Sequence, residues 1–335
     1  MTELDELFAG TRRLKNIRLT LEGQNECLLN LWLLCCGPEC EMSHELASMF
    51  RYGMTHRAPV MQRITSLRVR NQTSMLNDET ITLIADELVQ AGKDRIPVKR
   101  LTARFPEMTV DDSYKVQNLW RQRSEADGRK LAGRKIGLTS RAMQMATGIT
   151  EPDYGIIFDD MVLDSGCTFE WDKYTHPRVE MELAFKLNKD VEGPNANIFD
   201  VLNATEYVIP ALEILDSRIE MEGRTIVDTI SDNAAMGAMV IGGNPMKPSD
   251  IDLRWVSGIL FKNQIVEETG VAAGVLNHPA AGVYWLANKI AAHGDKLNAG
   301  ELILAGSFTR PMWVDKGDTV FADYGRMGTV TCHFA

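Results

Sequence analysis

The 335-residue chain lacks an excess of positive charge, because 46 acidic residues outnumber its 36 lysines and arginines. The formal net charge is −10 and the pI is near 5.2. Proteins that bind nucleic acid by neutralising phosphates need the opposite balance, and so do polybasic membrane anchors. The composition therefore argues against a nucleic-acid partner and against binding to an anionic membrane surface.

The chain also lacks an apolar run approaching the roughly 20 residues that span a bilayer. The nearest candidate, residues 27–36, is short, follows Glu22 and Glu26, and has no evident small-residue cleavage site. We therefore expect a cytoplasmic protein. With 44% hydrophobic and 24% charged residues, the composition is that of a globular protein that can bury a full core.

Paired C-x-x-C spacing, the usual mark of a structural zinc site, is missing as well. Four of the six cysteines lie near the start of the chain, at Cys27, Cys35, Cys36 and Cys40. A metal site there is one interpretation, and unpaired thiols in a poorly ordered segment are the one we favour. Residues 1–74 are then an extension of uncertain status, or the product of a misread start with Met75 as the true initiator.

A folded domain is predicted over residues 75–335. Asn77 provides a helix cap just ahead of two acidic residues, which suit the positive end of a helix dipole. A second helix is predicted from Thr109, which has capping-box spacing with Asp112. After Gly128, short apolar runs alternate with Gly, Asn, Asp and Pro, and this pattern predicts many short strands with a few inserted helices.

The clearest strand is predicted over Arg178–Leu187. There, large apolar residues alternate without interruption with charged residues or alanine. Further strands are predicted over residues 207–214 and 254–262. A helix is predicted over residues 277–291, with Asn277 as its cap.

Three glutamates in these strands need an explanation. Glu180 and Glu182 are two residues apart on one strand, so they share a face with their Cα atoms about 6.6 Å apart. Carboxylates this close raise each other's pKa, and a divalent cation with oxygen ligands removes the repulsion. Glu213 lies in a second apolar run, where an unpaired glutamate is costly to bury. The alternatives are that the pair faces water, and that Glu213 lies on an edge strand or pairs with Arg218.

Two more positions suggest proton chemistry. Lys135 lies among glycines and hydroxyls in the segment 133–140, where a lysine beside a bound anion can transfer a proton. The alternative is a surface lysine at a turn. Asp153 belongs to the acidic segment 151–155, for which an Asx-type turn is the alternative.

Signatures of other enzyme classes are absent. His176 and His278 have no Ser or Cys partner in the arrangement of a catalytic triad, so no nucleophile is predicted. The Gly242-Gly243 pair lacks the rest of a dinucleotide fingerprint and is interpreted as a turn.

Five segments together resemble a known family. They are GRKIGLTSRAM at 133–143, EPDYG at 151–155, PRVEMELAF at 177–185, SDNAA at 231–235 and GSFTRP at 306–311. In this order they resemble the hydratase/decarboxylase branch of the fumarylacetoacetate hydrolase superfamily, over about residues 75–335. The resemblance implies an α+β fold with a rolled, mixed β-sheet as a β-barrel-like core and with peripheral helices.

The resemblance also implies a Mg²⁺ or Mn²⁺ site. The family's E-x-E pair matches Glu180 and Glu182, and its third acid matches Glu213. The active-site lysine and its acidic partner match Lys135 and Asp153, so proton transfer is expected of these two residues. Contacts with substrate are expected from Leu138, Ser140, Ser307 and Arg310.

The implied activity is the addition of water to a small 2-oxo dicarboxylate during the breakdown of aromatic compounds. Arg310 is expected to bind the distal carboxylate through a bidentate contact, with Arg218 and Arg224 as alternatives. A hydratase of a monocarboxylate dienoate and an oxalocrotonate-type decarboxylase are the nearest alternative activities. A C–C bond hydrolase and a non-catalytic partner subunit are more distant ones. The family forms homo-oligomers, and the resemblance implies the same here.

Overall fold

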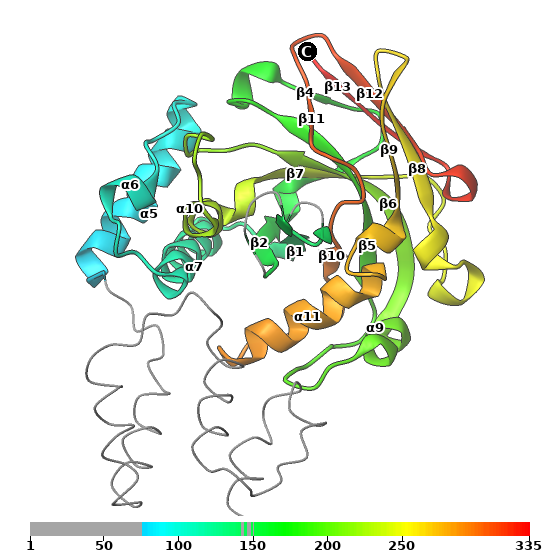
Figure 1. Cartoon of the computed structure of the whole chain (residues 1–335), viewed down its shortest axis with the longest axis horizontal. Coiled ribbons are helices and arrows are strands. Elements are labelled where there is room, and N and C mark those ends of the chain that lie inside the picture. The colour runs from blue at the N-terminus through cyan, green and yellow to red at the C-terminus, as the bar shows by residue number, and fades with distance from the viewer. Residues whose placement is uncertain (1–75, 142–143, 146–148, 150) are drawn as a thin grey trace, which may run out of the picture. The chain divides into compact units, whose positions relative to one another are not determined.

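The computed structural model describes residues 76–141, 144–145, 149 and 151–335. The predicted extension, residues 1–74, and its cysteine cluster lie outside the described residues. The helices are α5 (Asp78–Asp94), α6 (Leu101–Arg104), α7 (Val110–Ala126), α9 (Ile198–Ala204), α10 (Ile226–Ser231) and α11 (Pro279–Ala291) (Figure 1). None of these described helices is long and apolar enough to cross a membrane.

The two predicted helix caps are confirmed. The Asn77 side chain accepts a hydrogen bond from the backbone N–H of Thr80 at 2.8 Å, at the start of α5. Thr109 and Asp112 form a reciprocal capping box at the start of α7, with N–H to side-chain distances of 3.2 and 2.9 Å. These short-range contacts satisfy backbone donors that a helix leaves open in its first turn.

The predicted cap of α11 is wrong. Asn277 has a φ of 70°, in the left-handed region, and the helix begins two residues later at Pro279. His278 is the cap, because its Nδ1 accepts the backbone N–H of Ala280 at 3.1 Å. Proline suits the first helical position, where no N–H is needed.

The strands form two sheets (Figure 1). The large sheet runs in the order β2-β1-β10-β5-β6-β7-β3, and β11 also pairs with β5. Its strands are β1 (Leu131–Gly137), β2 (Asp153–Phe158), β3 (Val162–Asp164), β5 (Arg178–Leu187), β6 (Thr205–Leu215), β7 (Met236–Ile241), β10 (Leu302–Leu304) and β11 (Met312–Trp313). The sheet is mixed, since β1 is parallel to β10 and antiparallel to β2.

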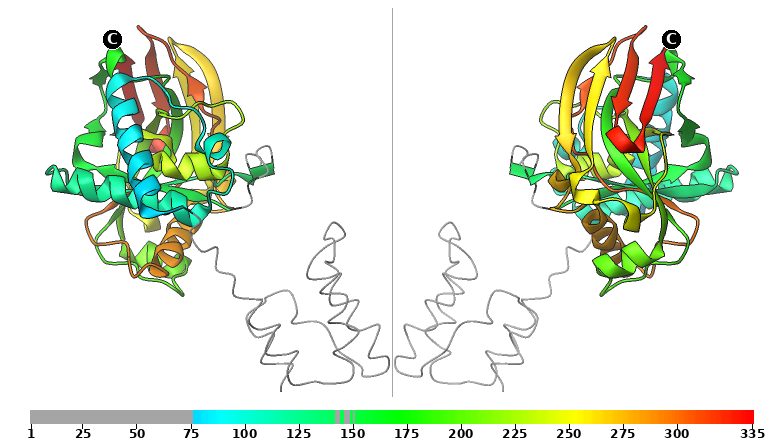
Figure 2. Two further views of the ribbon diagram at one scale, coloured as in Figure 1. Left: turned by 90° about the vertical axis from the view of Figure 1, so that its left-hand side faces the viewer. Right: turned by 90° about the vertical axis from the view of Figure 1, so that its right-hand side faces the viewer.

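The smaller sheet has the order β4-β13-β12-β8-β9. Its strands are β4 (Cys167–Phe169), β8 (Ser257–Lys262), β9 (Ile265–Val271), β12 (Thr319–Asp323) and β13 (Thr329–Phe334). Strand β8 is shorter than the predicted 254–262, because residues 253–255 form a 3₁₀ turn. Figure 2 shows this sheet on one side of the described domain and helices α5 and α7 on the opposite side.

The large sheet is rolled, as the resemblance implied. Lys135 on β1 and Glu213 on β6 are three strands apart, which is about 14 Å in a flat sheet. Their side chains nevertheless meet at 2.9 Å. Within the described residues the strand order still ends at β2 and β3, so the roll is not a closed barrel, and the fold is α+β.

Rolling buries both faces of the central strand β5. Val179, Met181 and Leu183 pack into the main apolar core, to which α11 also contributes. On the other face Glu182 is only 1% exposed. The interpretation that the glutamate pair faces water is therefore wrong, because an alternating pattern cannot reveal that the polar face is covered too.

Candidate metal centre

Three carboxylates meet where β5 and β6 pair. The antiparallel register places Glu180 directly opposite Glu213, and Glu182 follows two residues later on the same face. One oxygen atom from each side chain lies within 4.8 Å of the other two. Among the described residues, this acid cluster is the one group of His, Cys, Asp and Glu side chains with spacing suited to a metal ion.

Lys135 and Asp153 approach the acid cluster from the β1–β2 pair. Lys135 Nζ lies 2.9 Å from Glu213 Oε1, an ion pair that lacks the angles of a hydrogen bond. Asp153 is opposite Gly137 in the β1–β2 register. A Cβ atom at Gly137 would lie 2.2 Å from Asp153 Oδ1 and 3.4 Å from Lys135 Nζ. The absence of a side chain at Gly137 therefore leaves the space in which the acid and the ammonium group approach each other.

Burial and mutual repulsion raise the pKa values of Glu180 and Glu182. Part of Glu180 reaches solvent, but burial of its carboxyl group, together with the charge of Glu213, raises its pKa to about 8. Burial and the charges of Glu213 and Glu180 raise the pKa of Glu182 well above its usual range. Both shifts mean that burial and the neighbouring acids disfavour the charged forms of Glu180 and Glu182.

The pKa values of Lys135 and Asp153, the two predicted proton-transfer residues, are shifted in directions that suit proton transfer. Burial is the largest influence on the pKa of Lys135 and lowers it, but the charges of Glu213, Asp153 and Glu180 outweigh it, so the pKa is raised. Lys135 is thus held as an ammonium group. Burial raises the pKa of Asp153 despite the opposing charge of Lys135. An ammonium donor and a carboxyl group with a raised pKa therefore flank the acid cluster.

The acid cluster fits a hard divalent cation. Its donors are carboxylate oxygens, which Mg²⁺ and Mn²⁺ prefer. Among the described residues, Glu213 Oε1 and Asp153 Oδ2 are buried without a hydrogen-bond partner. The backbone orients Glu182, since its Oε2 accepts the N–H of Gly306 at 2.9 Å. A cation at this point would compensate the repulsion that the protein's own donors leave in place.

The residues predicted to contact substrate have different surroundings. Leu138 directly follows β1 and has a φ of 56°, a conformation rare for a leucine. The backbone of Ser140 pairs with that of Val275. The Ser307 hydroxyl lies at 3.2 Å from Met181 O and at 2.9 Å from Thr309 O, so it accounts for the shape of its own turn. Contact of these residues with substrate stays a prediction.

Arg310 lies apart from the buried groups. Its side chain is 78% exposed, and its Nη2 lies 2.7 Å from Glu268 Oε1. One arginine that the sequence analysis did not select is buried instead of exposed. Arg178 is 9% exposed and precedes Glu180 by two residues on the same face of β5. That spacing was visible in the sequence, but the burial of Arg178 was not.

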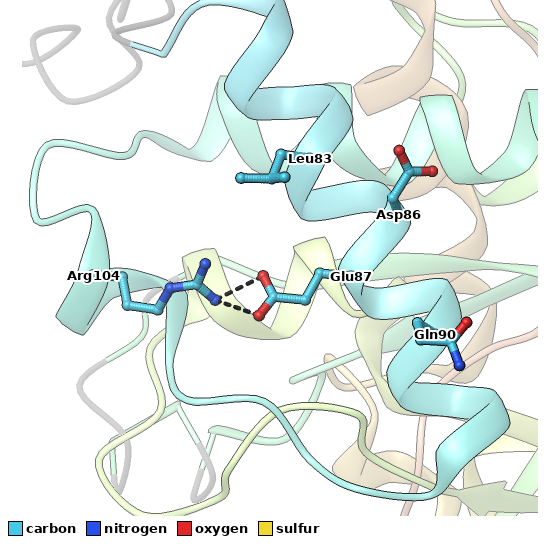
Figure 3. A pocket seen from close by; sticks show the side chains of 5 residues that line it. All are labelled: Leu83, Asp86, Glu87, Gln90 and Arg104. Carbon is cyan, nitrogen blue, oxygen red and sulfur yellow. Dashed lines mark hydrogen bonds and ion pairs between the residues drawn. The ribbon is translucent and has the colours of Figure 1, made fainter.

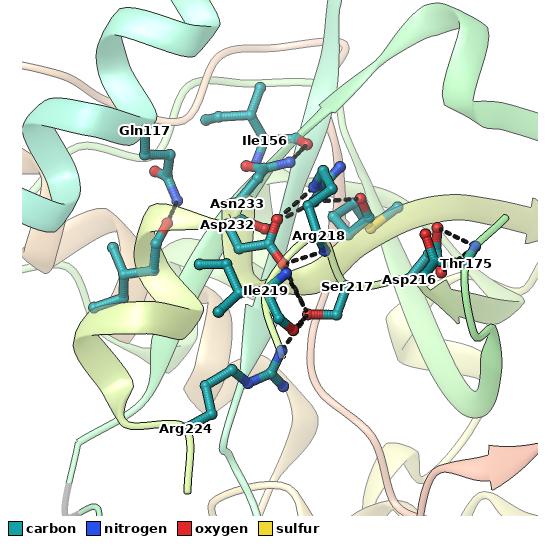
Figure 4. Close-up of polar contacts among 12 residues, drawn as sticks. Gln117, Ile156, Thr175, Asp216, Ser217, Arg218, Ile219, Arg224, Asp232 and Asn233 are labelled. Carbon is teal, nitrogen blue, oxygen red and sulfur yellow. Dashed lines mark hydrogen bonds and ion pairs between the residues drawn. The ribbon is translucent and has the colours of Figure 1, made fainter. Parts of the chain in front are cut away.

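A second buried polar group lies in the loop after β6 (Figure 4). Asp232 Oδ2 accepts hydrogen bonds from the Ser217 hydroxyl and from the backbone N–H of Arg218, both at 2.9 Å, and the Arg218 Nε donates to Oδ1. We call Asp232, Ser217 and Arg218 the Asp232 cluster. Because these bonds hold Arg218, Glu213 does not pair with it, and its nearest cation is Lys135.

A surface hollow near α5 is separate from all of these groups (Figure 3). Leu83 lines it together with the ion pair between Arg104 and Glu87, whose charged atoms are 2.7 Å apart. None of the predicted site residues contributes to it.

No family model matches the chain. Over 266 residues it is 51% identical to the 2-oxo-hept-4-ene-1,7-dioate hydratase of Escherichia coli, which covers 78% of this chain and 100% of that protein. The chain belongs to the hydratase/decarboxylase family of the fumarylacetoacetate hydrolase superfamily. A second member, the 2-keto-4-pentenoate hydratase of Paraburkholderia xenovorans, is 38% identical over 75% of this chain and 93% of its own length.

A solved structure of the family has the same fold. The 4-oxalocrotonate decarboxylase from Pseudomonas putida G7, in complex with magnesium and adipate, superposes with a TM-score of 0.77. The two chains are 33% identical, and the match covers 78% of this chain and all of that one. The membership predicted from the five segments is thereby confirmed, and so is the predicted fold class.

Proposed function

We propose that the chain is a divalent-metal-dependent hydro-lyase that adds water to 2-oxohept-4-ene-1,7-dioate, reacting as its 2-hydroxydienoate form. The product is 4-hydroxy-2-oxoheptanedioate, and the reaction is a step in the breakdown of 4-hydroxyphenylacetate or homoprotocatechuate. The observation that carries the proposal is the convergence of Lys135 and Asp153 on the acid cluster, in a chain 51% identical to a hydratase of this name.

In this proposal Glu180, Glu182 and Glu213 hold Mg²⁺ or Mn²⁺. When bound, the ion acts as a Lewis acid on the 1-carboxylate and the 2-oxo oxygen of the substrate. The carboxylates fix its position from two paired strands, β5 and β6, whose register is set by an unbroken hydrogen-bonded ladder at this point. The solvent-accessible part of Glu180 marks the side from which the substrate enters.

Lys135 and Asp153 move the protons. The 2-hydroxydienoate must lose its enol proton and gain a proton on carbon before the fourth carbon becomes electrophilic and water adds there. The Lys135 ammonium is a hydrogen-bond donor to the oxygen at C2, where negative charge develops. Asp153, whose pKa burial raises, takes up and returns a proton beside it.

The remaining predictions complete this proposal. Residues 75–335 form the catalytic domain, and Leu138, Ser140 and Ser307 border the substrate. The active protein is a homo-oligomer in the cytoplasm. A 2-hydroxypenta-2,4-dienoate hydratase and a 4-oxalocrotonate decarboxylase are the alternative activities, because family members of both kinds share this fold or sequence.

The test is an assay of the full chain with 2-oxohept-4-ene-1,7-dioate, with and without Mg²⁺, following ultraviolet absorbance and carbon dioxide together. We expect metal-dependent loss of the substrate without release of carbon dioxide. Release of carbon dioxide would identify a decarboxylase. Absence of turnover by folded, metal-loaded protein would refute the proposed function.

A further inference from the structure

Arg178 is a buried arginine for which the described residues provide no ion pair. Only 9% of the residue is exposed, and its Nε has no hydrogen-bond partner among the described residues. Its guanidinium carbon lies 5.1 Å from the centroid of the Trp313 ring, within the range of a cation–π contact. A cation–π contact compensates only part of the free-energy cost of burying a charge. A bound anion would therefore stabilise the Arg178 guanidinium group.

A second guanidinium group adds to the positive charge at this place. Arg224, in the loop between β6 and α10, donates from Nη1 to the Ser217 hydroxyl at 2.6 Å (Figure 4). Burial lowers the pKa of Arg178, and the nearby charge of Arg224 lowers it further. The charge of Arg224 also offsets part of the rise that burial causes in the pKa of Asp153. Geometry places Arg224 on the same side, because its partner Ser217 follows by two residues Leu215, which pairs with Arg178 in the β5–β6 register.

The position of Arg178 matches the length of a dicarboxylate. Arg178 and Glu180 point to the same face of β5, with Cα atoms about 6.6 Å apart along the strand. The carbon chain from C2 to C7 of a 2-oxoheptanedioate spans about 6 Å when extended, given carbon–carbon bonds of about 1.5 Å. A substrate whose first two carbons lie at the acid cluster is therefore long enough to reach a side chain two residues along the strand, and an arginine there can bind a carboxylate in bidentate fashion.

Two other arginines are less suited to this task. The Arg218 guanidinium already donates to the Asp232 side chain and, at 2.8 Å, to the Asp232 backbone oxygen. Arg310 is 78% exposed and paired with Glu268, so water screens its charge.

We propose that Arg178 and Arg224 form a subsite for the distal carboxylate of the substrate and make the chain select dicarboxylates over monocarboxylates. The inference rests on the proposed function, because it requires the other end of the substrate to lie at the acid cluster. It adds to that function the residues that would recognise the distal carboxylate.

The test compares two unreactive saturated analogues, 2-oxoheptanedioate and 2-oxoheptanoate, which differ only in the distal carboxylate. Binding to the full chain in Mg²⁺ is measured by titration calorimetry, for the wild type and for Arg178→Met, Arg178→Lys and Arg224→Met. The wild type is expected to bind the dioate at least about tenfold more tightly, the typical contribution of a hydrogen bond to a charged group. Arg178→Met should bring this ratio close to one, while Arg178→Lys and Arg224→Met retain part of it.

Arg326→Met is the matched control, because Arg326 is exposed and distant in sequence from both residues. It should keep the wild-type ratio. The subsite is refuted if the wild type does not bind the dioate or does not prefer it, or if neither Arg178→Met nor Arg224→Met changes the ratio. Loss of the ratio in Arg310→Met alone would assign the distal carboxylate to Arg310 instead. Failure of the proposed function looks different, since the dioate preference would persist without turnover of the unsaturated substrate.

Discussion

The acid cluster and the Asp232 cluster both bury carboxylates next to strand β6, but the protein treats them differently. Glu182 and Asp232 are each 1% exposed. The two oxygens of Asp232 accept hydrogen bonds from Ser217 and Arg218. Glu182 instead faces two further acids, and the nearest cation contacts Glu213 rather than Glu182.

The difference separates two uses of a buried acid. In the Asp232 cluster, hydrogen bonds compensate the cost of removing the charge from water, and the acid fixes the shape of a loop. In the acid cluster, like charges and unpartnered oxygens leave that cost uncompensated, which is the condition expected where a ligand or ion completes the site. The distinction depends on partners, because the burial of the two residues is the same.

The largest effect on activity is expected from Glu182→Gln. The glutamine can still accept the Gly306 N–H, but the acid cluster loses one charged donor. Turnover should fall by about a thousandfold, beyond the 10- to 100-fold cost of altering a residue that only supports a metal ligand. The metal-free protein should melt no earlier than the wild type, because a repulsive charge is gone. Steady-state kinetics in Mg²⁺ and a thermal melt of the metal-free protein test the two parts. A clearly lower melting temperature would mean that Glu182 is structural.

Asp232→Asn should show the reverse pattern. It leaves the Arg218 guanidinium without its carboxylate, and breaking a buried pair in this way costs about 3–5 kcal/mol of unfolding free energy. Urea unfolding measures the loss. The turnover of the molecules that remain folded should change little. A variant as stable as the wild type would contradict the structural role assigned to the Asp232 cluster.

Gly137→Ala tests whether the positions of Lys135 and Asp153 beside the acid cluster matter for the rate. The new methyl group would overlap Asp153 Oδ1, only 2.2 Å away, and force it from Lys135. Displacement by about 1 Å in a catalytic arrangement can cost about a hundredfold in rate. Steady-state kinetics of Gly274→Ala provides the control, because no atom lies within 4 Å of a Cβ there. Equal rates for the two variants would exclude Asp153 from proton transfer.

The smallest effect is expected at Asp228, another buried acid, whose two oxygens both accept hydrogen bonds. Burial raises its pKa, but hydrogen bonds from Thr102 and Thr225, at 2.8–3.0 Å, outweigh burial and leave it lowered. Since the folded pKa lies below the unfolded value of about 3.9, this stabilisation is complete above that pH and is lost as the pH falls through the folded pKa.

The measurement is the unfolding free energy of the wild type and of Asp228→Asn across pH. The difference between them should be about 1 kcal/mol, the typical cost of a lost helix cap, and constant from pH 5 to 7. It should shrink below about pH 4. A difference that grows on acidification would contradict the lowered pKa of Asp228.

Local features could be predicted because their causes lie within a few residues. The caps at Asn77 and Thr109 each depend on a side chain and an N–H three residues apart. The alternation over Arg178–Leu187 depends on the two-residue period of a strand. The cap at Asn277 was wrong because two neighbouring side chains can both cap a helix, and the left-handed φ of Asn277 gave that role to His278.

The sequence by itself determined the family, the positions of the main strands along the chain and the fact that Glu180 and Glu182 share a face. Only the tertiary structure decided that this face is buried, since that depends on the roll of the sheet. The same roll brings Lys135 to Glu213 across three strands. Arg178 became visible only in the structure, because a missing partner is a property of all the residues that surround a group. Near-neighbour periodicity carries no information about contacts formed between distant strands, and those contacts build the site.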